Sequence, residues 1–172
     1  MESNLEAEIK LATRMIQAGA RSVQIESNTS LSKRHIKRLY KEIKGCSPPS
    51  GCYPYSIDWF LNGKANFHSS ILFHYFSSSA EVNTLDYQRQ EILFTLDAYD
   101  AYLNEIHNMQ QSPVLNFVRA CSLILFHKSK MLLYQMCSHC DKRYIVSAYR
   151  LEIAKSCPHC KWARKNAYFK SN

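Results

Sequence analysis

Apolar residues recur at three- and four-residue spacing through the first 45 positions, which is typical of amphipathic helices. Gly19 and Gly45 are helix-ending residues, and Ser32 is placed to cap the helix that follows it. The pattern therefore predicts three helices joined by short turns, at about residues 5–18, 20–27 and 33–44. Together they suggest a helix-turn-helix-like unit over about residues 8–45.

The third predicted helix combines an apolar stripe with many cations. Ile36, Leu39 and Ile43 share one face, and basic residues occupy most of the remaining positions. Such a helix suits a DNA major groove, with phosphate contacts dominating. The residues predicted to contact DNA are Lys33, Arg34, His35, Lys37, Arg38 and Lys41. An ordinary solvated helix face remains the alternative, because Ser30 lies where the usual turn has glycine.

The middle of the chain reads as a loop followed by a helical core. Residues 46–55 contain three prolines and a glycine, which predict an extended loop over 45–58 with Cys46 and Cys52 as plain thiols. The helical core is predicted over 59–136, with helices at about 65–78, 86–107 and from Ser112-Pro113 to Met136.

Two features of this core have alternative interpretations. Ile92, Leu96, Tyr99 and Leu103 follow a three-four spacing that fits a partner-facing seam or the internal core of a bundle. His68 and His74 lie among aromatic and aliphatic residues, and a packed histidine is commoner there than a catalytic or metal-bound one.

Charge is unevenly distributed along the 172 residues, which carry a net charge of +8. Residues 1–45 have nine basic and five acidic side chains, residues 46–127 three and seven, and residues 128–172 ten and two. Two basic ends around an acidic middle indicate a polyanionic partner, with nucleic acid as the first candidate. The 46% hydrophobic content is that of a globular protein, and no apolar run reaches the length of a bilayer span.

Four cysteines form the clearest chemical motif. Cys137 and Cys140 make one C-x2-C pair, and Cys157 and Cys160 make a second after sixteen residues. This spacing predicts one structural zinc ion per chain, because four thiolates complete a tetrahedral site and leave no position for a reactive water. Redox C-x2-C motifs and disulfides are the weaker alternatives. His139 and His159 lie inside the pairs and are expected to be exposed loop residues, with replacement of a cysteine as a metal ligand as the weaker alternative.

The predicted zinc-binding segment, residues 137–172, is strongly basic. A metal-tied loop presents its cations with little further ordering on binding, so this segment is predicted as a second DNA-contacting surface. Its proposed contacts are Lys142, Arg143, Arg150, Lys155, Lys161, Arg164 and Lys165. The predicted fold is mainly α: a multihelical domain over 1–136 and a zinc-ribbon-like segment over 137–172.

The alternatives to a DNA-binding protein are a scaffold and an enzyme. A zinc-ribbon scaffold or RNA polymerase accessory factor would use the same basic patches to meet acidic protein surfaces. An enzyme is not expected, because the sequence has no glycine-rich phosphate loop, no recognisable nucleophile pair and no open metal site.

A family resemblance extends over nearly the whole chain. It is carried most specifically between Leu39 and Phe60, by Leu39-Tyr40-Lys41-Glu42, Gly45, Ser47-Pro48-Pro49, Gly51, Pro54, Ser56 and Asp58-Trp59-Phe60. Gly19-Ala20-Arg21, Arg119-Ala120 and the two cysteine pairs add to it. In these features the chain resembles FlhC, the C subunit of the bacterial flagellar master regulator.

The resemblance implies a cytoplasmic transcription activator. It implies a hetero-oligomer of two C subunits with FlhD-like D subunits, which binds promoter DNA of flagellar operons and recruits RNA polymerase. It also implies zinc on the four cysteines. Two departures are Cys121, where a larger aromatic residue is expected, and a tail that ends twelve residues after Cys160.

Overall fold

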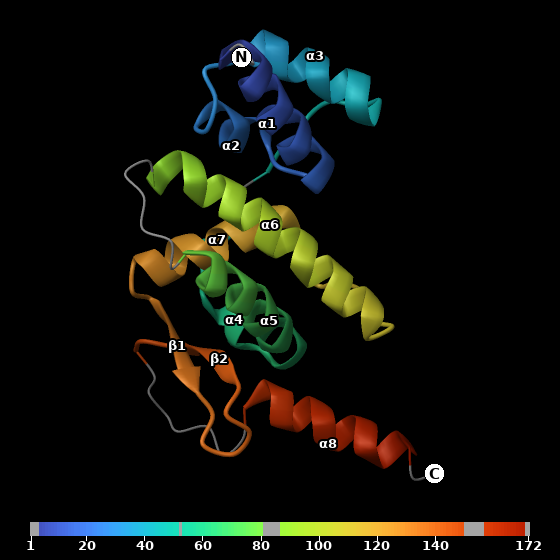
Figure 1. Ribbon diagram of the computed structural model, residues 1–172, viewed down its shortest axis with the longest axis vertical. Coiled ribbons are helices and arrows are strands. Elements are labelled where there is room, and N and C mark those ends of the chain that lie inside the picture. The colour runs from blue at the N-terminus through green and yellow to red at the C-terminus, as the bar shows by residue number, and fades with distance from the viewer. Residues whose placement is uncertain (1–3, 52, 81–86, 150–156, 171–172) are drawn as a thin grey trace.

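The computed structural model describes residues 4–51, 53–80, 87–149 and 157–170, and these residues are mainly helical (Figure 1). The helices are α1 (Asn4–Ala18), α2 (Ser22–Glu26), α3 (Lys33–Lys44), α4 (Asp58–Leu61), α5 (Gly63–Ala80), α6 (Tyr87–Asn108), α7 (Phe117–Lys128) and α8 (Pro158–Lys170). The strands are β1 (Leu132–Met136) and β2 (Arg143–Ser147). The prediction of a mainly α fold is confirmed. Within the described ranges no helix has the length and apolarity needed to cross a membrane.

Helices α1, α2 and α3 form a unit at one end of the molecule (Figure 1). The side chain of Ser32 accepts a hydrogen bond from the His35 amide, and Gly45 ends α3 in the left-handed conformation at φ 70°. These local signals explain why the predicted limits of the third helix are correct. The turn before α3 is tied to α1, because the amide of Ser30 donates to the Glu8 carboxylate at 2.9 Å. The use of this three-helix unit as a DNA-reading helix-turn-helix stays a prediction.

Helices α5, α6 and α7 form the middle of the molecule and contain most of its core. The apolar stripe of α6 is buried there, with Ile92 at 7%, Leu96 at 1% and Tyr99 at 7% exposure. The stripe is therefore internal core, and the partner-facing seam was the wrong interpretation. Arg14 of α1 joins the end unit to α6 through ion pairs of 2.7 Å with Asp97 and with Asp100.

The predicted helix from Ser112-Pro113 to Met136 is wrong at both ends. The segment before α7 is non-helical because the Tyr102 hydroxyl accepts hydrogen bonds from the amides of Val114 and Leu115. Helix α7 instead begins after Asn116, whose side chain accepts from the Arg119 amide. After α7 the chain turns and forms β1, so the last five residues of the predicted helix are a strand.

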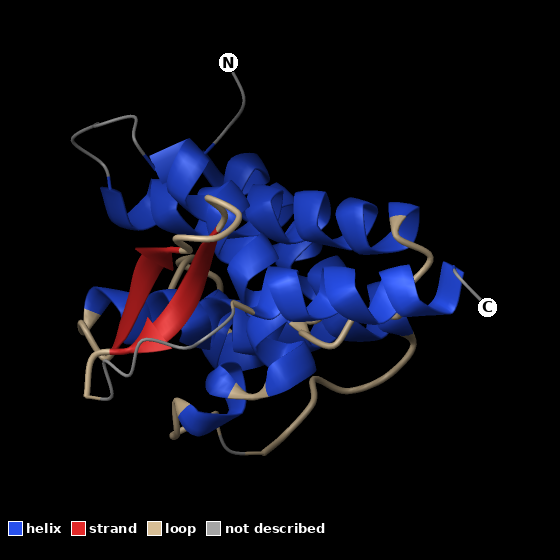
Figure 2. Cartoon of the chain, turned by 90° about the horizontal axis from the view of Figure 1, so that it is seen from below, coloured by secondary structure: helices blue, strands red, loops and turns tan. Residues whose placement is uncertain are grey.

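The hairpin of β1 and β2 is antiparallel, with Leu132 opposite Ser147 and Met136 opposite Arg143. Figure 2 shows it beside the helices. Two polar side chains of α5 dock β2. Asn66 donates to the carbonyl of Ile145 at 2.8 Å, and the Ser70 hydroxyl accepts from the Ile145 amide at 3.1 Å. The hairpin crosses the predicted boundary between residues 136 and 137, and that division stays a prediction.

Candidate metal centre and cationic surfaces

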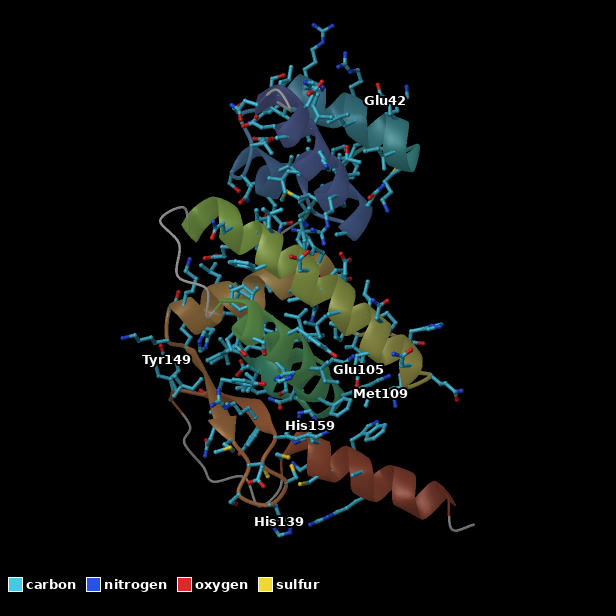
Figure 3. The ribbon with its side chains drawn as sticks, viewed as in Figure 1. Glu42, Glu105, Met109, His139, Tyr149 and His159 are labelled. Atoms are coloured by element: carbon cyan, nitrogen blue, oxygen red, sulfur yellow. The ribbon has the colours of Figure 1, made fainter. Side chains whose placement is uncertain are left out.

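Two short segments bring the four cysteines together. Cys137 and Cys140 lie in the turn of the hairpin, which is closed by hydrogen bonds from the Cys137 amide to the Lys142 carbonyl (2.9 Å) and from the Asp141 amide to the Cys137 carbonyl (3.0 Å). Cys157 immediately precedes α8, and Cys160 lies in the first turn of that helix. Figure 3 shows the sulfur atoms between the hairpin turn and α8.

The spacing of the sulfurs fits one tetrahedral ion. All four lie within 4.8 Å of one another, with 4.0 Å from Cys137 to Cys160 and 3.5 Å from Cys140 to Cys157. Sulfurs at about 2.3 Å from a central zinc ion would be about 3.8 Å apart, whereas a disulfide brings them to about 2.05 Å. The cluster can therefore hold a metal ion, and these cysteines are not paired as disulfides.

Backbone amides and burial shift the pKa values of the cysteine thiols in opposite directions. The amide of His139 donates to the Cys137 sulfur at 3.4 Å and lowers the pKa of that thiol to about 6. Burial raises the pKa of Cys157 to about 12. Four clustered thiolates would repel one another in this buried place, so a bound cation is what makes the fully ionised set favourable.

The two histidines inside the cysteine pairs differ. His139 is exposed, as predicted, and points away from the molecule (Figure 3). His159 was predicted to be an exposed loop residue, which is wrong: it lies on α8, half-buried, with its ring edge-on to Phe67 at 5.1 Å. Burial, and then the nearby Lys142, lower its pKa to about 4.

The hairpin and α8, which hold the four cysteines between them, are fixed to the helical core by stacked aromatic rings as well as by Asn66 and Ser70. Phe67 of α5 and Trp162 of α8 stack with centroids 5.4 Å apart and an interplanar angle of 10°. None of these docking residues was predicted. For Asn66 and Ser70 the signal in the sequence was a run of polar residues, Asn66, Ser69 and Ser70, inside an otherwise apolar helix.

The cations predicted around the metal centre are exposed where the structure describes them. Lys142 immediately precedes β2, Arg143 is its first residue, and Lys161 and Arg164 lie on α8. Arg150 and Lys155 lie outside the described residues, and Lys165 is described only as part of α8. We name the four described residues the metal-end surface.

Helix α3 carries the other predicted surface. Its cations Lys33, Arg34, Lys37, Arg38, Lys41 and Lys44 are all exposed, and His35 is half-buried. Lys33 is 3.7 Å from Glu26, and Arg38 is 3.6 Å from Glu42.

Arg34, Lys37 and Lys41 differ from those two cations, because no carboxylate in the described part of the chain pairs with them. They follow one another at three and four residues, so they form one stripe along α3. We name this stripe the α3 surface.

The two cationic surfaces lie at opposite ends of the molecule. In Figure 1, α3 is at one end of the long axis, and the hairpin and α8 are at the other. Helices α5, α6 and α7 lie between them. A ligand that contacts both surfaces must therefore be long, or must reach them as two separate segments.

The buried histidine of the core has a structural role. The Tyr102 hydroxyl accepts from two amides, so it donates its proton to Nδ1 of His68 at 2.8 Å. His68 is fully buried, and burial lowers its pKa to about 4. It is a neutral packed residue, as predicted, and it belongs to neither candidate surface.

Comparison with known proteins gives one family over almost the whole chain. The family described as "Flagellar transcriptional activator (FlhC)" matches residues 3–171. The "Flagellar transcriptional regulator FlhC" of Variovorax paradoxus (strain S110) is 33% identical over 154 residues, covering 90% of this chain and 74% of the relative. Those of Paraburkholderia atlantica and Enterobacter cloacae subsp. cloacae are 36% and 33% identical, covering 89% of this chain and 69% and 78% of the relatives.

Proposed function

The chain belongs to the FlhC family of flagellar transcriptional activators, and from this premise we propose that it binds promoter DNA as one subunit of a hetero-oligomer with FlhD-like D subunits. The family is one of transcriptional regulators, which is not an enzyme class. On the same premise the complex contains two copies of this chain, works in the cytoplasm at flagellar operons and recruits RNA polymerase.

The α3 surface is the observation that carries the DNA proposal. Arg34, Lys37 and Lys41 are exposed, aligned and without a carboxylate partner among the described residues. Cations held on a rigid helix bind phosphates without first breaking ion pairs, and they release condensed counterions from DNA. The buried face of the same helix, with Ile36 at 0% and Tyr40 at 2% exposure, fixes the stripe against the rest of the unit.

The metal-end surface is the second proposed DNA contact. We infer that the ion on Cys137, Cys140, Cys157 and Cys160 is zinc and that its role is structural, because four thiolates suit zinc and fill its tetrahedral shell. Zinc would supply charge neutralisation and a fixed link between the hairpin turn and α8. The chain itself holds Lys142, Arg143, Lys161 and Arg164 around that link.

The test is DNA binding by the complete complex. The chain, co-expressed with its D subunit, is mixed with labelled duplex from a flagellar promoter, and affinity is measured by fluorescence anisotropy over a range of salt. The proposal expects a Kd that rises steeply with salt and differs between promoter and scrambled duplex. A complex that retains no duplex at low salt would favour the protein-only scaffold.

A further inference from the structure

A groove outside both cationic surfaces contains two arginines whose guanidiniums lie over aromatic rings. It has a volume of about 410 Å3 and lies where the 45–58 loop meets the starts of α4 and α7. Arg21, Tyr53, Tyr55, Trp59 and Arg119 line it. No described residue that lines the groove is acidic. We name it the arginine–aromatic groove.

Arg119 is the central observation. Its guanidinium carbon lies 3.7 Å from the centroid of the Trp59 ring, and its side chain is half-buried. Its backbone amide is used by the Asn116 cap, but among the described residues no oxygen accepts from its guanidinium. Arginine stays charged in proteins, and stacking on a ring leaves the N–H edge of its fork open. A half-buried cation held in this way lacks the anion that would compensate its desolvation.

Arg21 places a second guanidinium at the same groove. It lies 5.2 Å from the centroid of the Tyr53 ring, and its Nη1 donates to the Gly51 carbonyl at 2.7 Å. This hydrogen bond fixes the arginine to the loop that forms the groove wall. Two guanidiniums therefore lie along the groove, each against an aromatic ring.

Exposed aromatic surface surrounds the charge. Tyr55 is 89% exposed and Tyr53 is 38% exposed. Tryptophan, tyrosine and arginine are the residues enriched at the energetic centres of protein interfaces. The groove therefore suits an occupant that brings both an anion and apolar side chains.

The charge of the surrounding chain distinguishes a protein occupant from nucleic acid. Residues 46–127, which supply most of the groove, carry three basic and seven acidic side chains. This net negative charge repels a polyanion, which carries many charges, more strongly than a single carboxylate. Arginine forks pair with carboxylates through two parallel hydrogen bonds. We propose that the arginine–aromatic groove binds a segment of a partner protein that carries a carboxylate beside an aliphatic or aromatic side chain.

The experiment selects peptides on the metal-loaded full-length chain. A phage library of random dodecapeptides is selected on the wild type and counter-selected on Arg119→Met, and the enriched peptides are then synthesised. They are expected to contain Asp or Glu next to a large apolar residue. Their affinity should fall at least about tenfold with Arg119→Met. It should not change with Lys130→Met, which removes an exposed cation outside the groove.

A double-mutant cycle tests the carboxylate contact directly. Replacing the peptide's Glu by Gln should weaken binding to the wild type by a similar factor and cause no further loss with Arg119→Met. If Arg119→Met fails to fold by circular dichroism, Arg119→Lys replaces it, with a smaller loss expected because the fork is gone. Enriched peptides without acidic residues, no Arg119-dependent peptides, or Arg119-dependent retention of duplex DNA instead of peptide would each overturn the proposal.

Discussion

Removing two cations from the α3 surface should change the salt dependence of DNA binding by a calculable amount. Lys37 and Lys41 are one helical turn apart, exposed, and without a carboxylate partner in the described ranges. If each contacts a phosphate, changing both to Met lowers the magnitude of the slope of log K against log salt by about 1.8, because each contact contributes about 0.9. Stability should change by less than about 0.5 kcal/mol, since both positions are on the surface.

The same numbers give a result that is easy to measure. Between about 50 and about 200 mM salt, the wild-type complex should lose about tenfold more affinity than the double variant. The assay is fluorescence anisotropy of a labelled promoter duplex at four or more salt concentrations. The effect applies to each copy of the chain that contacts the DNA, so a complex with two such copies would show twice the change in slope.

The matched control removes a cation outside both surfaces. Lys130→Met changes an exposed residue in the turn before β1 and should leave the slope unaltered. A double variant with the wild-type slope, or one whose affinity loss is the same at every salt concentration, would refute phosphate contact by α3.

Three further predictions concern the metal centre and the core. Cys157→Ser should reduce bound zinc below one ion per chain by elemental analysis and weaken the near-ultraviolet circular dichroism of the segment; undiminished zinc would contradict the four-sulfur site. Asn66→Ala should destabilise the fold by about 2–4 kcal/mol in urea unfolding, because the carbonyls of Phe60 and Ile145 lose their donor; a change below about 0.5 kcal/mol would show that this docking is unimportant. Burial lowers the pKa of His68 in the folded state to about 4, against 6.5 for the free side chain. The contribution of neutral His68 to the free energy of unfolding is therefore complete above about pH 6.5 and is lost as the pH falls toward 4. Over this pH range the free energy of unfolding of the wild type should fall by at most about 3 kcal/mol, and that of His68→Gln should not show this fall.

Local signals explain why much of the fold was predictable. The limits of α3 depend on a serine cap and a left-handed glycine, both of which act within one turn of the helix. The cysteine spacing predicts the metal site by itself, because two C-x2-C pairs can enclose one ion whatever sequence lies between them. The structure brings those four sulfurs together as the spacing predicted.

Non-local contacts determine the parts of the fold that were not predicted. Leu132–Met136 has no local feature that excludes helix, and it becomes a strand because it pairs with Arg143–Ser147. The hydroxyl of Tyr102 keeps the segment before α7 out of the helix, and Tyr102 itself is on α6. Asn66 docks the hairpin from 79 residues away; the polar run around Asn66 is visible in the sequence, but it does not identify Ile145 as the partner.

The separation of the two cationic surfaces makes their proposed roles distinguishable. The α3 surface and the metal-end surface share no residue, and the helical core lies between them (Figure 1). Effects of substitutions at distant sites without common partners usually add within about 0.3–0.5 kcal/mol. If both ends grip phosphates of one bound duplex, combining Lys37→Met with Lys161→Met should give the sum of the two single losses in binding free energy. If the metal end serves only to hold the fold together, Lys161→Met should cost nothing, whereas Cys157→Ser should still abolish binding. The two outcomes separate a DNA-contacting metal segment from a purely structural one.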